Sequence, residues 1–204
     1  ETWPKLIFSW QQCFDFGCSC YWLNNECYDR QESDFIYDID ATSYDDWIYF
    51  SFQLGSIVEI NNPDNSLDWD IAFKRNHMKT NGGLSGSGNV CAIVDSDNEW
   101  NNETFNECLD IPSYECQSDD MIQGNIFTYQ GCYNPNESHM FEDCIKNPAL
   151  DQWGGFDDSY NFNMNNYQFF IREINGLYVK FWPISYYDIN GESGKISMTY
   201  QYID

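Results

Sequence analysis

The sequence predicts an all-β, mostly antiparallel fold with long loops tied by disulfides. Aromatic residues make up 19% of the 204 residues and are rich in Tyr and Phe, which favour strands. They alternate with polar residues in short runs separated by Asn, Asp and Gly, as is typical of antiparallel sheets. The nine cysteines lack the CxxC pairs of zinc ribbons, so disulfides in an exported protein are the better interpretation.

Five runs carry this alternation and are expected to form strands. In chain order they are DWIYFSF (46–52), WDIAFKRNHMKT (69–80), YQFFIREI (167–174), LYVKFWPISYY (177–187) and GKISMTYQYI (194–203). Asn175-Gly176, between the third and fourth runs, is the dipeptide most typical of a tight hairpin. Long helical periodicity is missing, and at most a short helical turn fits 139–147.

The second run is basic and leads into a glycine-rich stretch, GGLSGSG. A phosphate-binding loop needs a Lys and then Ser or Thr after its last glycine, whereas Asn89 and Val90 follow here, so that motif is excluded. As a single strand, the run would enter the core at Trp69 and leave it by Asn76. One side of this strand would hold Ile71, Phe73, Arg75, His77 and Lys79, with His77 in a structural role.

The cysteines divide the chain into an appendage and a main domain. Residues 1–30 hold four of them and are predicted to be a small disulfide-stapled appendage, which precedes a β domain over 31–204. All nine are candidate disulfide residues with one left over and the pairing open: Cys13, Cys18, Cys20, Cys27, Cys91, Cys108, Cys116, Cys132 and Cys144. Four of them lie in the irregular region 98–165, which is expected to form long tied loops.

The formal net charge of -24 argues against nucleic acid and against anionic membrane surfaces as partners. It is typical of a solvated acidic surface on an extracellular protein. Two stretches, DSDNEW (95–100) and YDINGE (187–192), offer oxygen ligands for calcium. Neither completes the twelve-residue calcium loop that ends in a bidentate Glu, so both are interpreted as acidic turns.

No catalytic motif emerges, and the chain is predicted not to be an enzyme. Neither histidine lies near a nucleophile motif such as GxSxG, and paired carboxylates among 33 acidic residues are uninformative. No apolar run approaches the roughly 20 residues of a membrane span. The start of the chain lacks signal-peptide features, so a signal segment is expected to be absent from this chain.

Three segments resemble the HmuY family, the haem-binding, haemophore-like proteins of bacterial outer membranes. They read IDATSYDDWIYFSFQLGSIVEI (39–60), LDWDIAFKRNHMKTNGGLSGSG (67–88) and YQFFIREINGLYVKFWPISYYDINGESGKISMTYQYI (167–203). The resemblance covers about 39–97 and 160–204. It implies an almost all-β fold that pinches a haem between loops through two axial ligands, His or Met, in a surface-attached protein for haem uptake.

By this resemblance, the axial ligands lie between the two matched parts of the chain. The positional candidate for the first ligand is Met121, and the second is expected after Trp153, where Met164 is near. His139 and Met140 are alternatives if the inserted loop folds back over the pocket. Met121 and His139 are thus the candidate iron ligands, although methionines also fill gaps in packing and loop histidines are often merely exposed.

Two functions follow as hypotheses. The first is a secreted or surface-exposed haem-binding protein for haem and iron acquisition, on the extracellular side or outer-membrane surface of a bacterium. The alternative is an accessory subunit of an outer-membrane protein complex that kept the fold and lost the haem. Haem propionates would meet little positive charge in the central region, because Lys146 is the only cation between Lys79 and Arg172.

Overall fold

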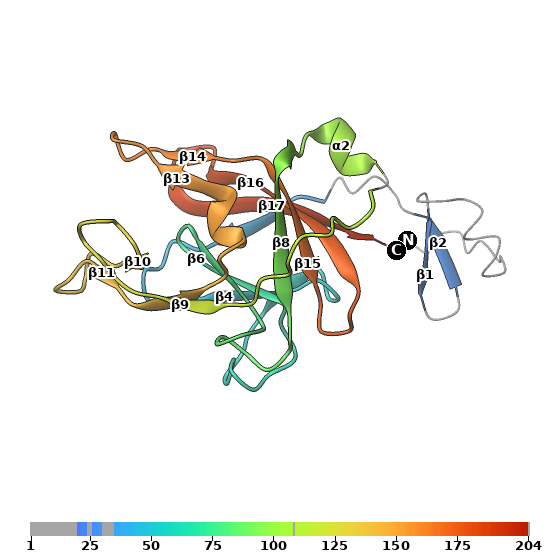
Figure 1. The fold of residues 1–204 in the computed structure, drawn as a ribbon, viewed down its shortest axis with the longest axis horizontal. Coiled ribbons are helices and arrows are strands. Elements are labelled where there is room, and N and C mark those ends of the chain that lie inside the picture. Colours follow the sequence, from blue (N-terminus) through green and yellow to red (C-terminus); the bar gives the residue numbers. More distant parts are fainter. Residues whose placement is uncertain (1–19, 24–25, 30–34, 108, 204) are drawn as a thin grey trace.

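A computed structural model of the chain describes residues 20–23, 26–29, 35–107 and 109–203 (Figure 1). All named strand pairs in this part are antiparallel, which confirms the predicted all-β, antiparallel fold. The predicted disulfide cysteines Cys13, Cys18 and Cys108 lie outside the described residues. Of Cys20 and Cys27, only the backbone is described.

The larger sheet has five strands in the order β3-β17-β16-β15-β8. Their bounds are β3 Tyr37–Asp40, β17 Ser193–Ile203, β16 Tyr178–Tyr187, β15 Tyr167–Arg172 and β8 Cys91–Glu99. The hairpin predicted at Asn175-Gly176 joins β15 to β16, and Gly176 takes a left-handed φ of 86° that suits glycine. The last three predicted runs are therefore strands of this sheet.

The smaller sheet has four strands in the order β5-β4-β6-β7. Their bounds are β5 Ser56–Val58, β4 Ile48–Ser51, β6 Ile71–Lys74 and β7 His77–Thr80. The prediction of one strand over 69–80 is wrong, because the chain reverses at Arg75 and Asn76, with Arg75 at φ 52°.

This turn resets which side chains share a face. Ile71, Phe73 and Met78 belong to the main core cluster. Because side chains alternate along strands, Lys74, His77 and Lys79 lie together on the opposite, outer face of the sheet. Arg75, in the turn, is not on the strand face where the sequence placed it.

The main core lies between the two sheets and is built largely of aromatic rings. Its largest fully buried members include Phe50, Phe52, Phe73, Phe169, Phe181, Trp153 and Tyr186. A second, smaller cluster forms on the other face of the five-stranded sheet, under the short helix α2 (Asn102–Asn106), around Trp100, Phe105 and Phe170. The side chain of Asn101 caps this helix by accepting from the backbone N–H groups of Glu103 and Thr104.

Four small strand pairs complete the described part. They are β1 (Cys20–Leu23) with β2 (Glu26–Asp29), β9 (Asp120–Ile122) with β12 (Cys144–Lys146), β10 (Cys132–Tyr133) with β11 (Phe141–Glu142), and β13 (Gly154–Phe156) with β14 (Phe162–Met164). A 3₁₀ turn, η2, spans Leu150–Trp153. The short helical turn predicted within 139–147 is wrong, since β11 and β12 occupy that stretch. None of the helices in the described ranges could cross a membrane.

Two disulfides tie the central loops, as predicted for this region. Cys91 in β8 is bonded to Cys116, beside the bridge between Ala92 and Gln117. Cys132 is bonded to Cys144 across the base of the β10–β11 pair. The pairing of the other five cysteines, and the division into 1–30 and 31–204, stay predictions; within the first 30 residues the structure describes the backbone of the β1–β2 hairpin.

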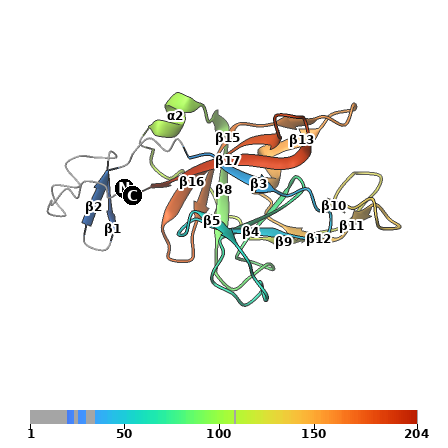
Figure 2. The same ribbon diagram turned by 180° about the vertical axis from the view of Figure 1, so that it is seen from behind.

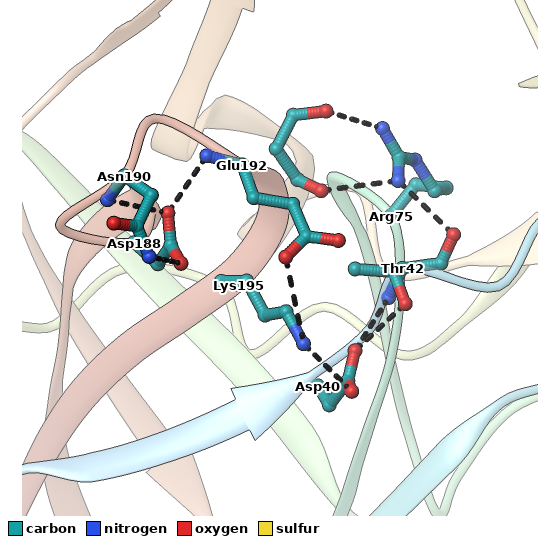
Figure 3. Close-up of polar contacts among 8 residues, drawn as sticks. Asp40, Thr42, Arg75, Asp188, Asn190, Glu192 and Lys195 are labelled. Carbon is teal, nitrogen blue, oxygen red and sulfur yellow. Dashed lines mark hydrogen bonds and ion pairs between the residues drawn. The ribbon is translucent and has the colours of Figure 1, made fainter.

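Arg75 joins the two sheets through the β6–β7 turn (Figure 3). Its guanidinium donates to the carbonyl of Thr42 at 3.0 Å, to the carbonyl of Ser193 at 3.1 Å and to the Ser193 hydroxyl at 2.7 Å. Beside it, Lys195 pairs with Asp40 at 2.8 Å. The basic turn is therefore held against the end of β3 and the start of β17.

Candidate functional site

Two hairpins, β10–β11 and β13–β14, project from the same end of the molecule (Figures 1 and 2). The segment 121–164, which contains both hairpins, exposes many large apolar side chains: Met121, Ile126, Phe127, Tyr129, Tyr133, Met140, Phe156 and Tyr160. Phe127 is 91% exposed and Tyr160 is 84% exposed. Exposed apolar side chains that form a contiguous patch mark a binding surface, so this end of the molecule is the candidate site.

A chain of ring contacts connects the bases of the two hairpins. The ring of Tyr133 in β10 lies 6.0 Å from that of Tyr44, and the ring of Phe156 in β13 lies 6.0 Å from that of Tyr186. The guanidinium of Arg75 bridges them, 4.5 Å from the Tyr44 ring and 6.0 Å from the Tyr186 ring. The two hairpins thus share an aromatic base with a cation in its middle.

The sequence alone did not predict a cation between the two hairpins. Arg75 lies about 60 residues before the first hairpin and about 80 before the second, and the β6–β7 turn brings it to their base. Lys74, on the neighbouring strand position, lies 3.8 Å from Glu142 of β11. The expectation of little positive charge around the central loops is therefore wrong at the base of the hairpins, where Arg75 and Lys74 lie. No local sequence signal could have placed these cations there.

The loop 134–140 at the tip of β10–β11 positions His139 and Met140. It is closed by a 2.7 Å hydrogen bond from the N–H of Asn134 to the carbonyl of Met140. The buried Asn134 side chain also donates to Asp45, at 3.2 Å, which anchors the loop to the segment before β4. His139 and Met140 are both exposed, and the Ser138 hydroxyl lies 3.1 Å from His139 Nδ1.

Met121 is also exposed but belongs to another strand pair. It lies in β9 opposite Ile145 of β12. Ile145 follows His139 by six residues in the chain. At roughly 3.3 Å per extended residue, six residues span at most about 20 Å. The strand register does not bring Met121 to the loop that holds His139.

Met164 lies in the second hairpin, at the end of β14. It is half-buried and packs against the main core, while the ring of Phe162 in the same strand lies 4.7 Å from that of Trp153 in a tilted arrangement. The indole N–H of Trp153 donates to the carbonyl of Asn76 at 2.8 Å, so the second hairpin is fixed to the β6–β7 turn. The four predicted ligand residues are thus distributed over β9, the β10–β11 tip and β14.

The acidic stretches considered for calcium use their carboxylates internally. Asp188 accepts from the N–H groups of Asn190 and Glu192, and these bonds lower its pKa (Figure 3). Asp95 accepts from the N–H of Asp97 and from the Asn98 side chain. Within the described ranges, no group of three or more His, Cys, Asp and Glu side chains could hold a metal ion. The stretch at 187–192 forms a turn after Tyr187, whereas the prediction of a turn at 95–100 is wrong, because Asp95–Glu99 belong to β8, where the register with β15 shifts between Tyr167 and Gln168.

The remaining basic residues near the site lie on the outer face of the four-stranded sheet. The Lys79 ammonium is surrounded by three rings, with centroids at 4.8 Å for Trp47, 5.3 Å for Tyr49 and 5.5 Å for Trp69. Burial lowers the pKa of Lys79. His77 lies on the same face and is buried, in line with its predicted structural role.

Comparison with known proteins identifies relatives of this fold. The family model described as "HmuY protein" matches residues 43–202. No sequence of a curated protein matches. An apo HmuY analogue from Tannerella forsythia is similar, with a TM-score of 0.61 and 17% identity over 83% of this chain and 95% of that one. A protein from Bacteroides vulgatus described as HmuY-like and haem-binding has a TM-score of 0.62 and 18% identity over 81% of this chain and 89% of its own. A protein from Bacteroides fragilis described as a lipoprotein has a TM-score of 0.62 and 20% identity over 85% of this chain and 92% of its own.

Proposed function

The chain belongs to the HmuY family, and from this membership we propose that it is a haem-binding, haemophore-like protein that serves haem acquisition at the bacterial surface, without catalysis. Haem would bind where the β10–β11 and β13–β14 hairpins project. The description of the Bacteroides vulgatus relative as haem-binding, and of the Bacteroides fragilis relative as a lipoprotein, supports the ligand and the surface location.

One observation supports the proposal: two hairpins at the same end of the fold both expose aromatic side chains, the first also exposes Met140, and the two share an aromatic base. A porphyrin is a flat, largely apolar ring with two carboxylates at one edge. Rings such as Tyr133 and Phe156 can cover its faces, and the positive charge of Arg75 favours its carboxylates.

The available side chains fit the chemistry of haem iron, which accepts His or Met as axial ligands. Met121, His139 and Met140 are exposed and free to bind, whereas Met164 packs on the core and would have to turn outward. When bound, haem supplies the iron, and the chain's own residues hold and orient it. Met121 lies in the β9–β12 pair and His139 in the loop at the tip of β10–β11, so the use of both as axial ligands would need this tip to lie over β9.

A spectroscopic titration with haemin tests the ligand assignment. Met121→Ala and His139→Ala should each abolish the six-coordinate spectrum or shift its Soret band, and Met78→Leu, at a buried core position, serves as a matched control that should leave it unchanged. Met140→Ala and Met164→Ala identify the alternative ligands. Unchanged spectra in all four variants at the candidate positions would reject the ligand set.

A second candidate function is an accessory subunit of an outer-membrane protein complex that does not bind haem. The separation of Met121 from His139 and the nearly complete exposure of Phe127 and Tyr160 favour it, because such tips can enter a partner's pockets. Gentle solubilisation from native membranes should then recover a stoichiometric partner protein, and a consistently monomeric protein would count against this function.

A further inference from the structure

His77 is a buried imidazole without hydrogen bonds. Its side chain is in β7 and the residue is 5% exposed, yet neither Nδ1 nor Nε2 has a hydrogen-bond partner within the described ranges. Buried polar groups are nearly always paired, so an orphaned ring is a specific feature that needs an explanation. It is also a residue that nothing in the proposed haem site uses.

The neighbours of His77 are positively charged on both sides. Lys74 of β6 is its direct cross-strand partner. On the other side, Asn147 donates to the carbonyl of Met78, which places the end of β12, with Lys146, beside β7. Lys74, Arg75 and Lys146 all act electrostatically on His77.

The same two lysines hold the β10–β11 hairpin over this face. Lys74 lies 3.8 Å from Glu142 of β11, and Lys146 donates to the carbonyl of Gly131, the residue before β10, at 3.5 Å. Lys146 also pairs with Asp151 of η2 at 2.8 Å. The two lysines that flank the buried His77 therefore both hold the hairpin segment, and both contacts involve the lysine ammonium groups.

We propose that His77 is an acid sensor: its protonation releases the β10–β11 hairpin from the outer face of the four-stranded sheet. A proton on the imidazole adds a positive charge among Lys74, Arg75, Lys146 and, further along β7, Lys79. The carboxylates next to Lys74 and Lys146, Glu142 and Asp151, are already paired with these lysines, and Asp119 and Asp64 act on Lys79. The new charge has no partner in the closed arrangement, and opening the hairpin gives it access to water.

The direction of the pH effect follows from linkage. Burial first, and then Lys146, Lys74 and Arg75, hold the pKa of His77 well below its usual 6.5. A histidine with a lowered pKa in the closed state stabilises that state fully above the ordinary pKa, and this stabilisation is lost as the pH falls below it. The open population should therefore grow as the pH falls from 6.5 towards 5.

The Cys132–Cys144 disulfide suits this role because it keeps the two ends of the segment together when the hairpin lifts. The moving segment contains His139 and Met140. Resting on the proposed function, opening would remove these side chains from the haem and weaken its binding in acid.

Hydrogen exchange of the apo-protein tests the opening without reference to haem. We expect amide protection over 131–143, corrected for intrinsic rates, to fall about 10-fold or more between pH 7 and pH 5. His77→Phe, which fills the site without a titrating group, should remove this fall, and His139→Gln, at the chain's other histidine, should retain it. Lys74→Met also removes the contact with Glu142 and should lower protection at every pH, but the midpoint of the pH transition should move to higher pH, because a charged His77 then meets one cation fewer.

The following results decide whether His77 is an acid sensor. No loss of protection in the wild-type chain, or the same loss in His77→Phe, would overturn the sensor role. If His77→Phe does not fold, an unmoved transition in Lys74→Met would overturn it instead. Opening in a protein that does not bind haemin would retain the sensor and reject only the proposed function, so that the two failures are distinguishable.

Discussion

The hydroxyl of Tyr202 donates a hydrogen bond of 2.8 Å to Oε1 of the buried Glu173. Asn175 donates to the other carboxyl oxygen at 2.9 Å. Burial nevertheless outweighs these bonds and raises the pKa of Glu173 from 4.5 to about 7, and nearby Asp70 adds to this shift. The β15–β16 turn therefore contains a carboxyl group that titrates near neutral pH.

Glu173→Gln should flatten the pH dependence of stability. A carboxyl group with a raised pKa in the folded state costs stability as the pH rises from about 4.5 to 7, and the cost is constant above that. The variant resembles the protonated form. Over this pH range its free energy of unfolding should rise relative to that of the wild-type chain by about 1 kcal/mol or more, or roughly 2–4 °C in Tm. Thermal unfolding at pH 5 and pH 8 measures it; an equal pH slope in both proteins, with exposed Glu192→Gln as control, would contradict it.

Arg75→Ala should destabilise the fold by about 2 kcal/mol, because its guanidinium makes three hydrogen bonds that join the β6–β7 turn to Thr42 and Ser193. Urea unfolding gives the free energy directly. Arg172→Ala removes a single 3.3 Å bond to the carbonyl of Asn89 and should cost clearly less. Equal losses in the two variants would show that Arg75 does not link the sheets.

Removal of the Cys132–Cys144 disulfide should loosen the hairpin. Replacing both cysteines by serine should cost about 3 kcal/mol by loop entropy and expose 131–143 to limited proteolysis. The Cys91–Cys116 pair closes a loop of similar entropic value at β8 and is the matched control. Its removal should lower overall stability without increasing cleavage of the hairpin; cleavage equally enhanced in both variants would contradict a local role for Cys132–Cys144.

The strands from 167 to 203 were predictable because alternation and Asn175-Gly176 are local signals. The reversal at Arg75 was not, because its turn carries neither glycine nor a leading asparagine, and Arg75 adopts positive φ only with the help of Thr42 and Ser193. Lys74 and His77 look like exposed strand residues in sequence, yet both are buried in the fold, and Lys74 contacts Glu142 of a hairpin formed some 60 residues later.

The candidate site was predictable in residue type and not in placement. Met121, His139 and Met140 can be named from the chain as haem-ligand types, but β9–β12 pairing and the loop 134–140 decide where they lie. Arg75, Tyr44 and Tyr186 at the base come from three distant segments. Only tertiary contacts bring such residues together.

The most direct measurement is a titration of the purified wild-type chain with haemin, followed by absorption in the oxidised and reduced states. We expect saturation at one haem per chain, with a sharp Soret band and the visible bands of six-coordinate iron in at least one redox state. Free-haem spectra in both states, from a folded protein, would contradict haem binding between the two hairpins.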